Sequence, residues 1–510
     1  MWGLVFRHAF CAGASGALFA LAAPPFDLYA SLWLGMAGLA FLVGEERAAR
    51  PGWLGVWFGV GANVVALRFV PSVVATFTTF SVGTGVVALL LLSLEQSLRW
   101  AVAAWASARL TRLGVPLGLA FGAGVFAGTF VPAVFPWTAA GGVTPVPAMV
   151  QLAEVIGERG VTFVMALSAG LLADAALACR LRRWRPAAWR ALASAAIPLG
   201  TYALGRVRID EVLAERAAAP TATVALVDPA TDPHDRWIPE EAPRILARLA
   251  GATELAERRD RAELTVWPEA AYPYPVAHES RRCPIGPFAM LPFGVRGPVL
   301  TGLVTTGNGG DLHNSAAVCL TNGALSEPQD KLHLLWFGET IPWLDRLPWV
   351  RAKFTRGIGL VAGDRVVVQR AGTVRASVLN CFEDTLPGAG REAMEPRPNL
   401  LVNVTNDGWF AGSTESELHM RLAALRAIES RRDLVRAVNE GVTGWIDAAG
   451  IVRARVSGKG PHAVVTEPAL LEAGPTLFDR FGDWPLAALL MATVAVRSRR
   501  RPDSLADEME

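Results

Sequence analysis

Long apolar stretches at the two ends of the chain limit most strongly how it can fold. A helix that crosses a membrane needs about 20 mostly apolar residues. Only 18% of the residues are charged, against roughly 25% in an average soluble domain. The apolar stretches are Val5–Ala23, Leu28–Gly44, Trp53–Val70, Ser81–Trp100, Val115–Phe135, Val161–Ala178, Trp189–Leu204 and the shorter Trp484–Val496. The sequence therefore predicts an α-helical membrane protein with about eight spans.

The charges between these stretches predict the orientation, because positively charged loops stay in the cytoplasm. The loops around Pro24–Asp27 and Pro71–Phe80 contain no Lys or Arg, whereas the alternate loops are rich in Arg. Those arginines are Arg47, Arg50, Arg99, Arg109, Arg112, Arg180, Arg182, Arg183, Arg185, Arg190, Arg497, Arg499, Arg500 and Arg501. We therefore expect a cytoplasmic N-terminus and an extracytoplasmic segment between the seventh and eighth stretches.

Two other interpretations of the apolar stretches carry less weight. Arg7 precedes the first stretch and Ala20-Leu21-Ala22 resembles a signal-peptide cleavage site, but six more stretches follow at once. Buried helices of a soluble protein are rarely apolar on all sides. Arg68 lies near the outer end of the third stretch, where its side chain can extend to the interface.

These patterns divide the chain into four parts: a seven-helix transmembrane domain (1–204), an extracytoplasmic domain (205–475), a C-terminal transmembrane helix (476–497) and a cytoplasmic tail (498–510). In the extracytoplasmic part, short Val- and Leu-rich runs predict buried strands. These runs are Thr223–Val227, Leu264–Trp267, Val299–Val304, Ala316–Leu320, Val366–Gln369, Ala376–Leu379 and Leu400–Val404. Glu240–Arg258 and Glu415–Arg431 are the predicted helices, the second with charges on one face and leucines on the other. The alternation favours an α/β domain.

Three polar residues stand in settings that suit acyl transfer. Glu269 comes just after a predicted strand, Lys331 opens a mostly apolar run, and Cys381 lies where a predicted strand turns. A carboxylate can take the proton of a thiol, whose thiolate is the nucleophile. A Lys ammonium and the backbone N–H of Phe382 can stabilise the oxyanion that follows. Singly, such residues are more often core or solvated groups.

Together these residues carry a family resemblance. The order Glu, Lys, Cys resembles the nitrilase superfamily. The flanking motifs are TVWPEAAYP, KLHLLWFGETIP, NCFE and NVTNDGWF, the last followed by RLAALRAIESRRDLVRAVNEGVT, and they resemble the apolipoprotein N-acyltransferase family. The motifs APPFDLY and FPW in the membrane part are similar to that family too. The resemblance covers essentially the whole chain and implies a nitrilase-like αββα sandwich for the extracytoplasmic domain.

The resemblance also implies residue roles. Cys381 would be the nucleophile, Glu269 the general base and acid, Lys331 the oxyanion stabiliser, and Glu339 a second glutamate that orients Lys331 or assists proton transfer. The implied substrate-binding residues are Trp237, Trp336, Phe337, Phe382 and Glu383. Ile341, Pro342 and Trp343 would add to an apolar cluster that covers the cleft, with ordinary core packing as the alternative.

The implied reaction is the last step of bacterial lipoprotein maturation. A phospholipid acylates the Cys, and the thioester passes its acyl group to the N-terminal diacylglyceryl-cysteine of an apolipoprotein. The implied enzyme is a monomer in the bacterial inner membrane, in contact with membrane lipid, with its catalytic domain on the periplasmic face. It needs no cofactor, metal or nucleic acid. Departures at Asp228, Trp336 and Phe382 leave substrate preference open, including a paralogue with another amine acceptor.

Other functions remain open at this point. The same triad would serve a membrane-anchored amidase with water as acceptor. A non-catalytic scaffold is disfavoured by the intact set of four residues, and transport by the lack of charged pairs in mid-span. Cys283 and Cys319 would lie in an oxidising compartment, where a disulfide is chemically allowed, although nothing in the sequence shows that they are close.

Overall fold

The computed structural model describes residues 2–45, 50–77, 81–232, 234–336, 338–340, 359–458 and 460–499. The chain forms two compact units. The first comprises Met1–Ile209 and Arg480–Glu510, and the second Asp210–Asp479. The division into four parts predicted from the sequence stays a prediction.

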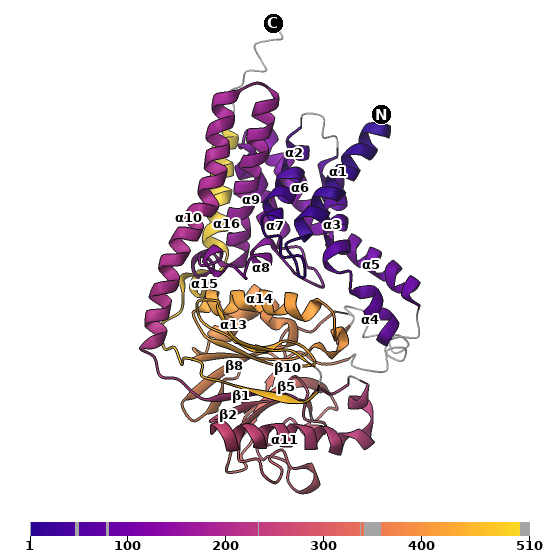
Figure 1. Cartoon of the computed structure of the whole chain (residues 1–510), viewed down its shortest axis with the longest axis vertical. Coiled ribbons are helices and arrows are strands. Elements are labelled where there is room, and N and C mark those ends of the chain that lie inside the picture. Colours follow the sequence, from indigo (N-terminus) through magenta and orange to yellow (C-terminus); the bar gives the residue numbers. More distant parts are fainter. Residues whose placement is uncertain are drawn as a thin grey trace. The chain divides into compact units, whose positions relative to one another are not determined.

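The first unit is helical (Figure 1). Its main helices are α1 (Trp2–Ala20), α2 (Ser31–Gly44), α3 (Pro51–Ala66), α4 (Val70–Phe77), α5 (Val82–Gln96), α6 (Leu98–Arg112), α7 (Leu117–Gly128), α9 (Ala153–Arg180), α10 (Trp184–Ala217, which continues into the second unit) and α16 (Trp484–Arg499). Glycines let α1 and α3 approach closely: a Cβ on Gly16 would lie 1.9 Å from the carbonyl oxygen of Phe58, and one on Gly61 2.1 Å from that of Gly13. Close contact at small residues is typical of helices that pack within a membrane.

The described helices support a membrane region but not the predicted count. Two helical stretches are long and apolar enough to cross a bilayer: Val82–Arg112, which joins α5 and α6, and Ala153–Arg180. The pair Pro51–Ala66 and Val70–Thr76 bends by 56° and would make a third if it forms one span. Other apolar helices in the described part of the chain, such as α2 and α7, are shorter. Eight spans therefore stays a prediction.

The helical unit contains a buried acid whose burial and partner were not predicted from the sequence. Glu158 of α9 is 1% exposed and accepts a 2.5 Å hydrogen bond from Thr138 Oγ1. Its partner lies 20 residues away, so inspection of one apolar stretch at a time could not reveal the contact.

The second unit contains two β-sheets. The first has the order β13-β1-β2-β4-β5-β6, with β3 on β4, and the second has the order β12-β11-β10-β9-β8-β7. The strands of the first are β1 (Val224–Asp228), β2 (Leu264–Val266), β3 (Val276–Ala277), β4 (Val299–Thr306), β5 (Leu312–Cys319), β6 (Gln329–Asp330) and β13 (His462–Thr466). Those of the second are β7 (Gln369–Ala371), β8 (Val374–Asn380), β9 (Leu400–Asn406), β10 (Leu434–Asn439), β11 (Thr443–Ile446) and β12 (Val452–Val456).

Three apolar layers hold these elements together. Leu226, Val266 and Leu300 of one sheet pack with Val378 and Val402 of the other to form the central core. Outside the first sheet lies α11 (Ala242–Asp260), and outside the second lie α13 (Pro387–Met394) and α14 (Glu415–Ser430). Figure 1 shows the helices on the two outer faces of the paired sheets. The predicted αββα sandwich is confirmed.

Two predictions in this unit were wrong in detail. The strand expected at Val366–Gln369 is instead β7, which begins at Gln369 and pairs with β8 as a short hairpin. The charged face expected on the helix at Glu415–Arg431 is buried: Arg426 and Glu429 of α14 are at most 1% exposed and form a 2.7 Å ion pair. Pairing offsets part of the cost of burying each charge.

A disulfide joins Cys283 to Cys319, with the Cα atoms 5.9 Å apart. It ties the segment before the short helix η4 (Gly286–Phe288) to the end of β5. The pair that the sequence left open is therefore close in the fold.

Candidate active site

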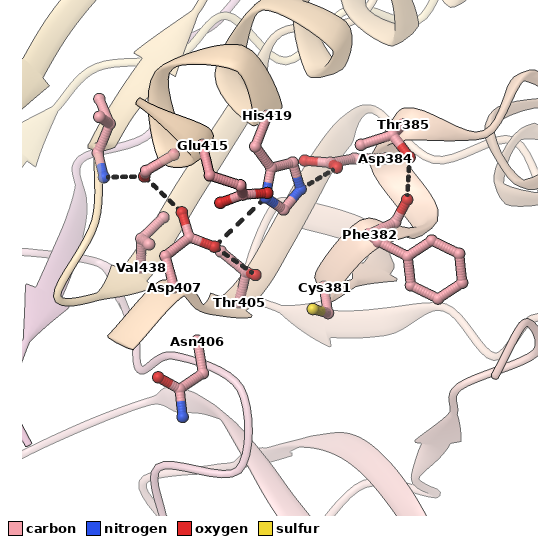
Figure 2. Close-up of polar contacts among 12 residues, drawn as sticks. Cys381, Phe382, Asp384, Thr385, Thr405, Asn406, Asp407, Glu415, His419 and Val438 are labelled. Atoms are coloured by element: carbon pink, nitrogen blue, oxygen red, sulfur yellow. Dashed lines mark hydrogen bonds and ion pairs between the residues drawn. The ribbon is translucent and has the colours of Figure 1, made fainter. Parts of the chain in front are cut away.

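Cys381 lies where β8 ends and the 3-10 turn η5 (Cys381–Thr385) begins. Its φ of 55° falls in the left-handed region, which is uncommon for a residue with a side chain. The Asn403 side chain holds this strained position by donating a 2.9 Å hydrogen bond to the Cys381 carbonyl. The predicted strand-to-turn position of the thiol is confirmed, and Figure 2 shows Cys381 close to Thr405.

Lys331 lies between two carboxylates. It follows β6, is 1% exposed, and its backbone N–H donates to the Asn314 carbonyl at 2.8 Å. Its Nζ is 2.9 Å from Glu339 Oε1 and 3.3 Å from Glu269 Oε1. Four predicted residues thus meet at one point, because Lys331 also interacts electrostatically with Cys381.

The sequence did not single out Asn314, which connects the two glutamates. Its Nδ2 donates to Glu269 Oε1 at 2.7 Å and to Glu339 Oε1 at 3.0 Å, and its Oδ1 accepts from the Asn380 side chain at 3.2 Å. Asn314 is buried within β5, a strand that is otherwise mostly small and apolar in its second half. A polar residue in a buried strand was the available signal.

Burial and the carboxylates at the site keep the thiol protonated at rest. Burial and the Glu269 carboxylate raise the pKa of the Cys381 thiol well above its ordinary value, and the opposing effect of Lys331 is smaller. Burial alone would lower the pKa of Lys331, but Glu269, Cys381 and Glu339 together raise it well above its usual range. The resting site therefore holds a neutral thiol beside an ammonium and two carboxyl groups.

Glu383 links two backbone segments of the site through hydrogen bonds. Its Oε1 accepts from the backbone N–H groups of Leu332 and His333 at 2.7 and 2.9 Å, and its Oε2 accepts from Asn380 N at 2.7 Å. Both oxygens are occupied, and the residue is 3% exposed. These contacts bind the segment after Lys331 to the turn of Cys381. They favour a positioning role over the substrate contact expected for Glu383.

The structure describes only some of the other predicted substrate-binding residues. The ring of Phe382 lies 5.3 Å from Lys331 Nζ, and Trp336 is 44% exposed. Trp237 ends the short helix η2 (Asp235–Trp237), but its side chain lies outside the described residues. Phe337, Ile341, Pro342 and Trp343 also lie outside them. The apolar cluster over the cleft stays a prediction.

A small cavity of about 20 Å³, room for about one water molecule, adjoins Glu269. Its polar lining includes Thr231, Asp232, Arg236 and Asn439. Arg236 interacts electrostatically with Glu269, and burial lowers the pKa of its guanidinium to about 10. A water-sized polar group could therefore reach the Glu269 carboxylate from this side.

Comparisons with known proteins extend over nearly the whole chain. The model of the apolipoprotein N-acyltransferase N-terminal domain matches residues 15–171, and that of the carbon-nitrogen hydrolase matches residues 223–466. An apolipoprotein N-acyltransferase from Geobacter metallireducens is 29% identical and covers 96% of this chain and 94% of its own length. One from Bradyrhizobium diazoefficiens is 30% identical and covers 98% and 96%. The chain belongs to the apolipoprotein N-acyltransferase family.

The family resemblance stated from the motifs is thereby confirmed. The predicted acyltransferase class and the nitrilase-type catalytic domain agree with it. Among solved structures, Saccharomyces cerevisiae Nit3, a member of branch 10 of the nitrilase superfamily, aligns with 49% of this chain and 90% of its own at 15% identity and a TM-score of 0.36. All four predicted catalytic residues of this chain fall within residues 223–466, the segment that matches the carbon-nitrogen hydrolase model.

Proposed function

We propose that this chain transfers an acyl group from a phospholipid to the N-terminal diacylglyceryl-cysteine of apolipoproteins, through a thioester on Cys381. The observation that carries the proposal is the buried Lys331 ammonium between Glu269 and Glu339, beside a thiol at a strand end. Membership of the apolipoprotein N-acyltransferase family supports the choice of substrates.

The first half-reaction acylates the enzyme. Glu269 takes the proton of the Cys381 thiol as the sulfur attacks the ester carbonyl of the phospholipid. Lys331 and the backbone N–H of Phe382 stabilise the tetrahedral oxyanion. The intermediate collapses, the C–O bond breaks, and Glu269 returns the proton to the glycerol oxygen that leaves as lysophospholipid. A thioester on Cys381 remains.

The second half-reaction removes the acyl group from Cys381. The α-amino group of the lipoprotein attacks the thioester carbon while Glu269 takes a proton from the nitrogen. The C–S bond breaks, and the proton passes from Glu269 to the sulfur. Two bulky lipids thus use one site in turn, as a ping-pong sequence allows. Glu339 orients Lys331 through their 2.9 Å contact in both steps.

The substrates also explain why the site is joined to apolar helices. Extraction of an acyl chain into water costs about 0.8 kcal/mol per CH₂. An enzyme held at a membrane avoids most of that cost. We propose that it is a multi-pass protein of the bacterial cytoplasmic membrane, with the catalytic domain on the periplasmic face, as the arginine distribution indicates. We propose further that it acts as a monomer.

The test supplies both substrates to the full-length protein in liposomes. A phospholipid with a labelled acyl chain and a synthetic diacylated lipopeptide should yield triacylated lipopeptide and lysophospholipid in equal amounts. Cys381→Ala should abolish both products. Rapid release of labelled fatty acid without lipopeptide, together with no acylation when lipopeptide is added, would show an amidase or esterase that uses water.

A further inference from the structure

A threonine hydroxyl lies close to Cys381 on the adjacent strand. β8 and β9 run parallel, and Asn380 pairs with Val404, so Cys381 and Thr405 stand beside each other at the carboxyl ends of the two strands. The Thr405 side chain is fully buried, and its hydroxyl lowers the pKa of the neighbouring Cys381 thiol. Figure 2 shows the two side chains at this edge of the sheet. The mechanism proposed above makes no use of Thr405.

The same hydroxyl has a second neighbour in Asp407. Thr405 Oγ1 lies 3.4 Å from Asp407 Oδ1, which is long for a hydrogen bond between oxygens. Asp407 has two other donors, Ser416 Oγ at 2.5 Å from Oδ2 and His419 Nδ1 at 3.3 Å from Oδ1. A hydroxyl has one proton to donate, so it serves either the carboxylate or the sulfur. Asp407 loses little when Thr405 turns away.

A buried ionic cluster holds both neighbours of the sulfur in place. His419 Nε2 lies 2.7 Å from Oδ1 of Asp384, which stands in the same turn as Cys381, while its other nitrogen faces Asp407. Burial alone would lower the pKa of His419, but Asp384 and Asp407 raise it to about 10, so the ring is an imidazolium. One side chain of α14 therefore ties the turn after the nucleophile to the end of β9.

The cluster balances its own charge. Asp407, Glu415 and His419 bring their ligand atoms within 4.8 Å of one another, a spacing that would suit a metal ion. Arg436, however, pairs with Asp384, so two cations already face the two aspartates. Burial and the Asp407 charge raise the pKa of Glu415 to about 8, which leaves it neutral at pH 7. The geometry thus favours a fixed support for the Cys381 turn.

We propose that Thr405 is a further catalytic residue: its hydroxyl turns from the Asp407 carboxylate to the Cys381 sulfur as the thiolate forms, and donates a hydrogen bond to it. The thiol proton passes to Glu269, and Thr405 keeps its own proton throughout. When the thioester forms, the sulfur loses its charge and the hydroxyl returns to Asp407. The inference rests on the proposed function only in taking Cys381 as the nucleophile.

Few groups around the sulfur favour its thiolate form, so a hydrogen bond from Thr405 can affect how readily the thiolate forms. Glu269 and Glu339 oppose a negative charge on the sulfur, whereas Lys331 and Thr405 favour it. Lys331 divides its charge among three anionic groups once the thiolate exists. The Thr405 hydroxyl is neutral and does not compete for the charge of Lys331. Its hydrogen bond can therefore make a large relative contribution to thiolate formation.

The test measures the alkylation rate of Cys381 by iodoacetamide against pH, in the full-length protein, with the Cys381 peptide quantified by mass spectrometry. A hydrogen bond to a charged group contributes enough that T405V should shift the midpoint of the profile upward by about one to two pH units. Thr405→Ala should shift it similarly, which guards against a packing effect of Val. Thr405→Ser should keep the wild-type midpoint.

Ser416→Ala is the matched control, because it removes a hydroxyl from Asp407 that does not touch the sulfur. Its midpoint should stay at the wild-type value. A T405V and T405A midpoint equal to wild type, in protein with an unchanged thermal transition, would overturn the proposal. So would an equal shift in S416A, which would place the effect at Asp407. Alkylation needs neither phospholipid nor lipopeptide, so this outcome is separate from a failure of acyl transfer.

Discussion

At the scale of single residues, the site is organised around a thiol that is neutral at rest. Three ionisable groups from two loops converge on it: Glu269 after β2, and Lys331 and Glu339 in the segment after β6. The motifs around them allowed their roles to be proposed from the sequence. Asn314 and Thr405 could not be found that way, because one asparagine in a strand and one threonine at a strand end carry no distinctive pattern. Only the pairing of β4 with β5 and of β8 with β9 brings them to the site.

The raised pKa of Cys381 predicts a pH dependence with a definite sign. A thiol with a raised pKa holds less thiolate than free cysteine at any given pH, so the alkylation midpoint should lie above the ordinary value of about 8.5. Glu269→Gln removes a negative charge beside the sulfur and should lower that midpoint. Lys331→Met removes the positive charge and should raise it. A midpoint in Glu269→Gln above that of the wild type would contradict the assigned electrostatics.

At the scale of elements, periodicity and apolar runs predicted most of the central strands and both long helices of the catalytic unit. They failed where a buried element carries charge. Strand β10 was not predicted, because its sequence LVRAVN contains Arg436, a fully buried residue that pairs with Asp384. α14 was expected to show a charged face, yet Arg426 and Glu429 neutralise each other inside the fold. Such partners are distant or on other elements, so a local pattern cannot reveal them.

The bracing role of Glu383 predicts a loss of both stability and activity on its removal. Glu383→Ala would leave three backbone N–H groups without their acceptor. At about 1 kcal/mol or more for each unsatisfied donor, we expect the free energy of unfolding to fall by roughly 3 kcal/mol. Thermal unfolding in detergent measures this as a lower Tm. The matched control is Glu392→Ala, a partly exposed glutamate whose side chain pairs only with His333 in the described contacts, and it should change Tm little.

The disulfide predicts a stability effect without a catalytic one. Cys283 and Cys319 are 36 residues apart, and a native disulfide across such a loop typically contributes about 2–4 kcal/mol. The double variant Cys283→Ser, Cys319→Ser should therefore unfold at a lower temperature, with acyl transfer at low temperature close to the wild type. Mass analysis of the wild-type protein should show a gain of two hydrogens at this pair on reduction. Two free thiols before reduction would contradict the bond.

At the scale of the whole molecule, the chain combines a helical unit with a nitrilase-type unit, and the family relatives align across both. The family and the αββα sandwich could be predicted from the sequence, because specific motifs and strand patterns carry them. The number of spans could not be established in the same way. Apolar stretches mark helices, but the structure breaks the third predicted stretch at Ala66 and extends the fourth to Arg112.

The proposed orientation predicts which positions a membrane-impermeant maleimide can reach in intact cells whose outer membrane has been permeabilised. In a protein with Cys11, Cys179 and Cys381 replaced by Ser, Leu255→Cys on α11 should be labelled, since Leu255 is 66% exposed. Arg183→Cys, in a loop expected in the cytoplasm, should react only after the inner membrane is disrupted. The reverse pattern would place the catalytic unit in the cytoplasm.

The central claim is that Cys381 carries the acyl group between the two substrates. Its most direct test is to incubate the full-length protein with labelled phospholipid alone and to analyse the Cys381 peptide. We expect an acyl adduct on Cys381 that neutral hydroxylamine releases, that is absent from Cys381→Ala, and that disappears when diacylated lipopeptide is added. Protein that acylates the lipopeptide without ever forming this adduct would contradict the account.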